Sequence, residues 1–386
     1  MDFSFTEEQQ MIRDTAEAFL AEVSTSEAIR AAMITVRGYD PALWQRITSE
    51  MYWQAIHIPE QYGGMGLGYV ELVAMLEQMG RYLLCSPFFS TVCLGTNALL
   101  IAGSEQHKTD YLARICDGSL TATLAYTGSG GHWGSDAVQV IAGKQGQNYQ
   151  LNGTLRYVPD GHTADLLIIA ARTLGSAGDQ GISLFAVPAA SAGVTRRYLP
   201  TMDQTRKQAE ISLDNVSVPA SALMGEEAKA WPQLQKIIQL ATIAVAAEQM
   251  GGAQQVLDAT VAYTKERVQF GRPVAGFQAV KHRAAEMMLK TEVSRSAVYY
   301  AACIAEEAMH GGPLAIELEE AASVAKAYCS DAYFQNAGDA IQLHGGVGFT
   351  WEYDVHLYFK RAKSSEIFLG NAAKHRENIA RLLLDS

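Results

Sequence analysis

The sequence contains few cysteines, and their arrangement argues against a protein held together by disulfides. Only five cysteines occur among 386 residues, an odd number without a Cys-x-x-Cys pair. They are Cys85, Cys93, Cys116, Cys303 and Cys329. Small disulfide-stapled domains pair their cysteines, whereas a reducing cytoplasm keeps thiols free. We therefore expect free thiols and a cytoplasmic protein.

Basic residues are also scarce, because 30 Lys and Arg face 41 Asp and Glu, for a net charge of −11. A nucleic-acid-binding protein would need a dense basic surface, so that class is not expected. A few local Arg or Lys residues can still hold a small anionic ligand. The opening MDFSFTEEQQMIRDTAEAFL lacks a basic region followed by an apolar run, so we expect no signal peptide. The apolar stretches are too short for a membrane span.

Several catalytic patterns are missing as well. The sequence contains no HExxH, GxSxG or P-loop motif, which excludes the zinc protease, serine hydrolase and P-loop kinase readings. No metal site is predicted. The composition, 48% hydrophobic and 18% charged, is that of a globular protein.

The order of predicted elements is helical, then β-rich, then helical. Helical periodicity begins at Thr6, which is followed by two glutamates suited to a first helical turn. Short β-rich runs such as Ala137 to Ala142 then predict a small antiparallel barrel or sandwich. We predict an N-terminal α-helical domain (1–118), a middle β domain (119–225) and a C-terminal α-helical bundle that also carries oligomerisation (226–386).

The most informative stretch runs from Gln342 to Gly370 and reads QLHGGVGFTWEYDVHLYFKRAKSSEIFLG. It follows a long helical pattern and breaks at Gly345 and Gly346. Glycines past a helix end allow positive φ and let backbone amides approach a ligand. A plain helix C-cap and turn is the alternative for any single Gly-Gly pair. No strand precedes the glycines, so the stretch is not a Rossmann fingerprint.

Its form, Gln-x-x-Gly-Gly-x-Gly-Phe-Thr-x-Glu-Tyr, resembles the C-terminal signature of the acyl-CoA dehydrogenases, which desaturate acyl-CoA thioesters between the α and β carbons. Four further segments resemble the family in the correct order, namely FSFTEEQQMIRD, IPEQYGGMGLG, LNGTLRYV and ERVQFGRPVAGFQAVKH. The resemblance implies an α+β multidomain fold that ends in a four-helix bundle. It also implies bound FAD, an acyl-CoA substrate, an electron-transferring flavoprotein as electron acceptor, and a homotetramer or a heterotetramer with a related subunit.

The resemblance further implies two groups of cofactor-binding residues. In the β region, Tyr126, Thr127 and Ser135 correspond to the flavin-binding strand and loop, and Tyr157 and Val158 to the segment beside the flavin ring. In the C-terminal region, the matching residues reach a neighbouring subunit's FAD (Arg267, Gln269, Phe270, Gln278) or the adenine and pyrophosphate end (Gln342, Gly345, Gly346). Cross-strand packing remains the alternative for both tyrosines, and complementing a helix dipole for Arg267.

The sequence departs from the family pattern at the flavin. The family's Thr-Glu-Pro-Gly-x-Gly-Ser-Asp is replaced by the longer, glycine-rich TGSGGHWGSD, and Trp-Ile-Thr by Tyr157-Val158-Pro159. Proline offers neither a side-chain hydroxyl nor a backbone N–H. A family hydrogen bond to the N5 edge of the flavin is therefore in doubt.

The expected catalytic base is missing too. Abstraction of the α proton needs a carboxylate beside the thioester. The family's usual position for this Glu corresponds to Leu369, and a second family position to Ala241. Glu366 and Glu248 are weak candidates in the neighbourhood. Their alternatives are an ion pair with Lys363 or Lys360 for Glu366, and a hydrogen-bonded structural acid between helices for Glu248.

Three interpretations remain open from the sequence. The first is an active dehydrogenase. The second is a non-catalytic subunit that pairs with a relative that keeps the Glu, as for sterol side chains or other bulky acyl groups. The third is a flavin-dependent relative with different chemistry, such as a monooxygenase. The small residues Ala241, Ala244 and Ala247 suit either a bulky acyl group or close helix packing.

Overall fold

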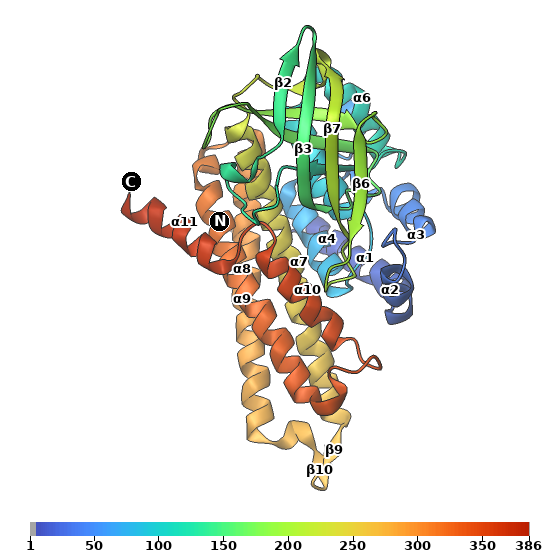
Figure 1. Cartoon of the computed structure of the whole chain (residues 1–386). Coiled ribbons are helices and arrows are strands. Elements are labelled where there is room, and N and C mark those ends of the chain that lie inside the picture. Colours follow the sequence, from blue (N-terminus) through green and yellow to red (C-terminus); the bar gives the residue numbers. More distant parts are fainter. Residues whose placement is uncertain (1–4, 386) are drawn as a thin grey trace. The chain divides into compact units, whose positions relative to one another are not determined.

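A computed structural model of the chain describes residues 5–385 and divides them into two compact units (Figure 1). The helical unit comprises the chain up to Ala31, Gly68–Leu84 and the chain from Thr242 on. The sheet unit comprises Ala32–Leu67 and Cys85–Ala241. This division differs from the predicted three domains, whose boundaries stay a prediction. Residues 1–4 and 386, at the outer ends of the predicted first and third domains, lie outside the description.

The first helix begins where its capping groups are. α1 (Glu7–Val23) is capped by Thr6, whose hydroxyl accepts from the Gln9 N–H at 3.2 Å, while the Gln9 side chain accepts from the Thr6 N–H at 3.0 Å. The predicted helix start at Thr6 is thereby confirmed. α2 (Ser26–Met33) follows, and α4 (Tyr69–Arg81) packs against α1 with most of its residues buried.

The C-terminal part of the chain is helical, as predicted, and α9 contacts α8, α10 and α11. Gly251 and Gly252 in α7 allow close packing within the helical unit. A Cβ at Gly251 would lie 1.8 Å from the Glu77 carbonyl oxygen of α4, and one at Gly252 would lie 2.4 Å from the Tyr333 ring of α9. The helices are α7 (Trp231–Glu266), α8 (Gln278–His310), α9 (Leu318–His344), α10 (Val355–Ile367) and α11 (Ala372–Leu384).

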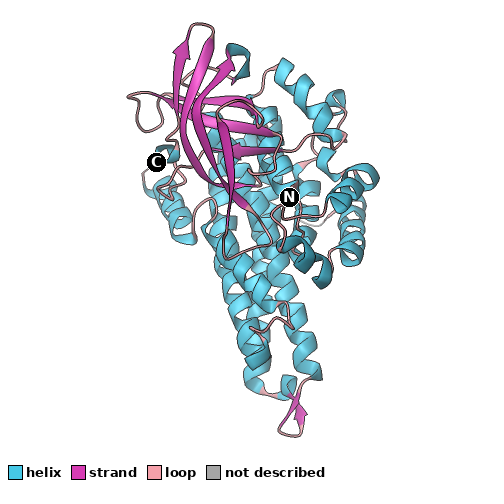
Figure 2. Ribbon diagram, turned by 45° about the vertical axis from the view of Figure 1, so that its right-hand side comes forward, coloured by secondary structure: helices cyan, strands magenta, loops and turns pink. Residues whose placement is uncertain are grey.

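The sheet unit combines short helices with one sheet, drawn in magenta in Figure 2. Its helices are α3 (Pro41–Arg46), α5 (Asn97–Ala102) and α6 (Glu105–Cys116), with π-helical segments at Ile47–Met51 and Phe89–Thr96. Its strands are β1 (Ala122–Ala125), β2 (Ile141–Gln145), β3 (Asn148–Pro159), β4 (Leu166–Thr173), β5 (Ile182–Pro188), β6 (Val194–Leu199), β7 (Gln208–Pro219) and β8 (Leu223–Met224).

The strand order is β6-β7-β3-β2-β4-β5-β8, and β1 also pairs with β4. β1 and β2 each pair with β4 in parallel, so the sheet is mixed. The prediction of a purely antiparallel sheet was wrong in this respect. Side chains such as Val140, Leu155 and Phe185 form its apolar core. The predicted order of helical, β and helical regions is confirmed.

One predicted strand, Ala137 to Ala142, is wrong in its extent, because β2 begins only at Ile141. Ala137, Val138 and Val140 are buried, which explains the apolar pattern. The Val138 carbonyl, however, accepts from the Arg172 side chain at 2.9 Å. Side-chain hydrogen bonding thus replaces strand pairing there.

All five cysteines are free thiols. Across residues 5–385, no helix is both long and apolar enough to cross a membrane.

Candidate flavin and acyl-CoA site

In the sheet unit, two predicted site segments about thirty residues apart lie side by side. Thr127 follows β1 closely, and its carbonyl accepts from the Arg156 N–H of β3 at 2.8 Å. The Thr127 hydroxyl donates to the Arg156 carbonyl at 2.6 Å. This pair of hydrogen bonds places Tyr126 and Thr127 beside Tyr157 and Val158.

Tyr157 lies in a β-bulge, since the pairing of β3 with β7 shifts between Leu155 and Val158. It has φ +59° and is 37% exposed. Cross-strand packing therefore does not account for this tyrosine. Bulges and non-glycine residues at positive φ concentrate next to functional sites. The Val158 side chain instead packs into the sheet core, which leaves only its backbone for a ligand.

The long glycine-rich loop is closed at its base. The Gly128 N–H donates to the Ala137 carbonyl at 2.9 Å, and the Arg172 guanidinium donates to the Ser135 carbonyl at 2.8 Å. Within the loop, the Trp133 ring lies 6.3 Å from the Tyr126 ring. The loop thus holds Ser135 near β1 and adds an aromatic side chain that the family pattern lacks at this point.

Tyr126 is a buried tyrosine of the sheet unit. It is 4% exposed, and its hydroxyl has no hydrogen-bond partner among the described residues. Burial raises the pKa of Tyr126, so the phenol stays protonated. Most buried polar atoms in folded proteins have a hydrogen-bond partner, so this hydroxyl is an exception to the usual pattern.

The predicted residues of the helical unit are, in contrast, exposed. Arg267 follows α7, and the hairpin of β9 (Val268–Gln269) and β10 (Arg272–Pro273) comes next. Figure 1 shows this hairpin at the end of the long α7 and α8 helices. At its tip, Phe270 has φ +55° and is 91% exposed. The hairpin thus projects an aromatic side chain away from its own unit.

The end of α9 lies close to the root of this hairpin. The Tyr263 ring, one turn before Arg267, stacks on His344 at 4.3 Å, and its hydroxyl donates to the His344 carbonyl at 3.2 Å. Gly345 caps α9 at φ +65°, so the C-cap reading holds. The space where a Cβ would stand at Gly345 or Gly346 is also open. The remaining predicted residues, Gln269, Gln278 and Gln342, are exposed.

Both family positions for the catalytic base carry buried apolar side chains. Leu369 is 2% exposed at φ +60° in the turn between α10 and α11, and Ala241 is fully buried in α7. Glu366 pairs with Lys363 at 2.8 Å, which is the ion pair considered from the sequence. Glu248 is 7% exposed, and its carbonyl packs against Gly80 of α4.

Sequence reasoning missed the residues that hold the Leu369 turn. Lys326 of α9 is fully buried and donates to Ser330 Oγ (2.9 Å), the Glu366 carbonyl (2.9 Å) and the Gly370 carbonyl (3.0 Å). His375 Nε2 lies 3.1 Å from the Leu369 carbonyl. Burial lowers the pKa of Lys326 to about 7. The only signal in the sequence was a lysine inside the apolar helical run SVAKAYC.

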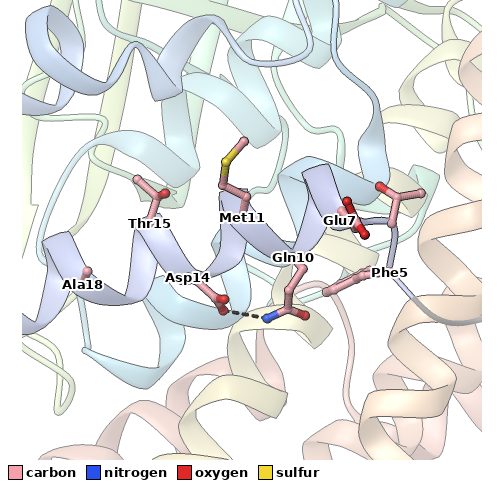
Figure 3. A pocket seen from close by; sticks show the side chains of 8 residues that line it. Phe5, Glu7, Gln10, Met11, Asp14, Thr15 and Ala18 are labelled. Atoms are coloured by element: carbon pink, nitrogen blue, oxygen red, sulfur yellow. Dashed lines mark hydrogen bonds between the residues drawn. The ribbon is translucent and has the colours of Figure 1, made fainter.

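The helical unit also has a surface pocket near the N-terminal end of the described chain, far in sequence from the predicted site residues. Phe5, Thr6 and side chains of the first half of α1 line it, and Gln10 donates to Asp14, one turn further along the same helix, at 2.6 Å (Figure 3). None of the predicted site residues belongs to its lining, so we assign it no role.

Comparisons with known proteins identify the class. The family description "Acyl-CoA dehydrogenase, N-terminal domain" matches residues 6–119, and "Acyl-CoA dehydrogenase, C-terminal domain" matches residues 230–384. Acyl-CoA dehydrogenase IpdE2 of Mycolicibacterium smegmatis is 31% identical over 98% of both chains. Butyryl-CoA dehydrogenase from Megasphaera elsdenii has a similar structure, with TM-score 0.90 and 28% identity over the whole of both chains. The ChsE4-ChsE5 complex from Mycobacterium tuberculosis contains another similar chain, with TM-score 0.88 and 28% identity over the whole of both chains.

The chain belongs to the acyl-CoA dehydrogenase family of FAD-dependent oxidoreductases. The residues present fit that cofactor at the end of α9, which leaves open space for a ligand at Gly345 and Gly346. Pro159 is a departure that removes one possible donor.

Proposed function

We propose that this protein takes part in the α,β-desaturation of an acyl-CoA thioester as the subunit that lacks the proton-abstracting carboxylate. A related subunit that carries the carboxylate would complete the enzyme. The observation that carries the proposal is the pair of buried apolar residues, Leu369 and Ala241, at both family positions for the base. Neither an aliphatic side chain nor a methyl group can accept a proton.

The two acids near these positions do not replace the base. The Glu366 carboxylate is engaged with Lys363 at 2.8 Å. Glu248 lies in α7 where its backbone contacts Gly80 of α4, a position that suits a structural acid between helices. The similarity to a chain of the ChsE4-ChsE5 complex is compatible with a paired enzyme.

The remaining residues have roles in holding the cofactor and the assembly. Bound FAD would supply the acceptor for the β hydride, and the protein's part is to bind and orient it. Tyr126, Thr127, Ser135 and Tyr157 would hold the flavin from the sheet unit. The exposed hairpin with Arg267 and Phe270 would reach the FAD of a neighbouring subunit in a tetramer.

We further infer that an electron-transferring flavoprotein reoxidises the flavin. We also infer that the protein works in the cytoplasm, where its five free thiols stay reduced.

Purification of the chain alone, followed by anaerobic addition of acyl-CoAs of several sizes, tests this proposal. We expect a visible flavin spectrum that no acyl-CoA bleaches. Bleaching by any thioester would overturn the proposed lack of a base, and Glu248→Gln and Glu366→Gln variants would then locate it. Bleaching that appears only after a related subunit is added would support the paired enzyme.

A second experiment installs the missing group. Leu369→Glu places a carboxylate in a buried turn, where desolvation would raise its pKa toward that of a useful base. We expect slow bleaching by acyl-CoA that is absent from the unaltered chain and from Leu369→Gln. Gln fills the same volume as Glu, so it controls for packing. Equal bleaching by both variants would contradict a role for the carboxylate.

A further inference from the structure

Two side chains from neighbouring helices hold the turn between α10 and α11. Lys326 of α9 donates to the Glu366 carbonyl at 2.9 Å and to the Gly370 carbonyl at 3.0 Å. His375 Nε2 of α11 lies 3.1 Å from the Leu369 carbonyl oxygen. Leu369 itself adopts φ +60°, a conformation that a non-glycine residue keeps only when its surroundings impose it. The shape of the turn therefore depends on two titratable groups.

The amine of Lys326 is buried without a counter-charge. The side chain is fully buried, and no carboxylate of the described residues lies within ion-pair distance of it. The Glu366 carboxylate of α10 acts on it electrostatically but pairs with Lys363 at 2.8 Å. The Asp331 carboxylate of α9 pairs with Arg376. Burial of an unpaired ammonium is costly, which lowers the pKa of this lysine to about 7.

The other groups around this amine supply no negative charge. On α9, burial raises the pKa of the Cys329 thiol to about 12, so it stays protonated. On α11, burial lowers the pKa of His375 to about 4, with a smaller contribution from the nearby lysine, so its ring is neutral at pH 7. α7 presents the amide of Gln249, which donates to Ser330 Oγ at 3.1 Å. α8 presents the Ser294 carbonyl, which accepts from the Cys329 thiol at 3.9 Å.

The three oxygens that contact the amine suit its neutral form. Two are the carbonyls of Glu366 and Gly370, which can only accept a hydrogen bond. The third is the Ser330 hydroxyl at 2.9 Å, which can donate as well as accept. A neutral amine can donate to both carbonyls and accept from the hydroxyl. Loss of the proton therefore removes the buried charge and breaks none of the contacts that hold the turn.

We propose that the Leu369 turn is a pH-responsive element, which closes more tightly when the Lys326 amine is neutral and opens more readily when Lys326 or His375 carries a proton. An open turn lets water reach both groups and hydrate their charges. The open form then binds more protons than the closed form, so the equilibrium constant for opening must rise as the pH falls. The inference rests on the fold alone, and it stands whether or not this chain lacks the catalytic base.

Amide hydrogen exchange at residues 366–371 between pH 6.5 and 8.5 tests the proposal on the purified protein. The rates are divided by those of the unfolded chain at each pH, which leaves the equilibrium constant for opening. In this range His375 stays neutral when buried, so Lys326 is the group that titrates. With the lysine pKa near 7 in the closed turn and about 10.4 in the open one, the constant should fall roughly 20-fold from pH 6.5 to 8.5.

Two variants assign this fall to the buried amine. Lys326→Met should abolish the pH dependence between pH 6.5 and 8.5, whatever its absolute exchange rate. Lys363→Met removes the surface lysine that pairs with Glu366 beside the same turn, and it should keep the full fall. A flat profile in the unaltered protein, or an equal fall in Lys326→Met, would overturn the proposal.

A second measurement needs no variant and decides the question if Lys326→Met fails to fold. The protein is labelled with ¹³C-lysine, and its ε-carbon signals are followed by NMR across the same pH range and up to pH 11. One lysine that titrates near pH 7 would support the proposal, whereas lysines that all titrate near pH 10 would contradict it. Neither experiment uses an acyl-CoA, so failure here is distinct from failure of the proposed function.

Discussion

The two groups of predicted cofactor residues differ in how the chain holds them. In the sheet unit, Tyr126 and Thr127 are buried and tied to β3 by hydrogen bonds from Arg156 and Thr127. In the helical unit, Arg267 and Phe270 are exposed on a hairpin at the end of two long helices. The sheet-unit residues are held in place by contacts within the chain, whereas the hairpin residues are exposed and available to a binding partner.

This difference follows from the cost of exposing or burying each type of residue. A buried position must satisfy its polar atoms within the chain or through a ligand. Phe270 is 91% exposed, and the only ring that contacts it among the described residues is that of Phe277, edge to face. Most of its apolar surface therefore gains no burial from the fold and is expected at an interface. We therefore propose that the sheet-unit residues contact the chain's own flavin and that the hairpin serves assembly.

Removal of the hairpin side chains should have the largest effect. In the double variant Arg267→Ala, Phe270→Ala, the affinity for FAD should fall roughly 100-fold. That is the loss expected when two interface anchors, worth about 1–2 kcal/mol each, are removed. Its melting temperature without FAD should barely change, because exposed side chains contribute little to stability. Flavin content after gel filtration and calorimetry measure the two effects.

The matched control is Ile316→Ala, since Ile316 is 88% exposed near the start of α9 in the same unit. It should keep its FAD. If the hairpin double variant also keeps FAD at full affinity, the hairpin is not a cofactor arm and the contrast between the two groups fails.

The sequence was sufficient for the residues that follow simple local rules. The Thr6 cap, the glycine stop after α9 and the order of helical and β regions all came from local patterns. The Tyr157 bulge and the orphan Tyr126 hydroxyl did not, because both depend on how β1 and β7 pair with distant strands. Lys326 was missed for the same reason, as its partners Glu366 and Gly370 are some forty residues away.

Lys326 extends the comparison, since it gives the helical unit one internally held position, the Leu369 turn. Lys326→Met removes donors to the Glu366 and Gly370 carbonyls while it keeps an unbranched side chain. Loss of two hydrogen bonds at about 1 kcal/mol each should speed amide exchange at residues 367–371 roughly 30-fold. Hydrogen-exchange mass spectrometry measures the exchange rate.

The control is Lys363→Met, which breaks only the surface pair with Glu366. In this variant the exchange rate should change less than about threefold. Equal exchange in Lys326→Met and the unaltered protein would show that the turn holds itself.

The smallest expected effect compares one buried histidine from each unit. Burial lowers the pKa of His57 in the sheet unit and of His375 in the helical unit to about 4, in the latter case with a contribution from nearby Lys326. Both are neutral in the folded protein, whereas in the unfolded chain they bind a proton below about pH 6.5. The unfolded state therefore holds more protons between pH 4 and 6.5, and stability must fall as the pH drops through that window.

Each histidine should account for roughly 2 kcal/mol of the stability lost between pH 7 and 4.5. His57→Gln and His375→Gln, whatever their stability at pH 7, should each show a shallower decline in urea unfolding. If the two units unfold separately, limited proteolysis should show a flatter profile of the sheet unit in His57→Gln and of the helical unit in His375→Gln. Parallel profiles for both variants and the unaltered protein would mean that neither histidine resists protonation in the fold. A shallower decline of stability in only one of the two units would show that only the histidine of that unit stays neutral at acidic pH in the folded protein.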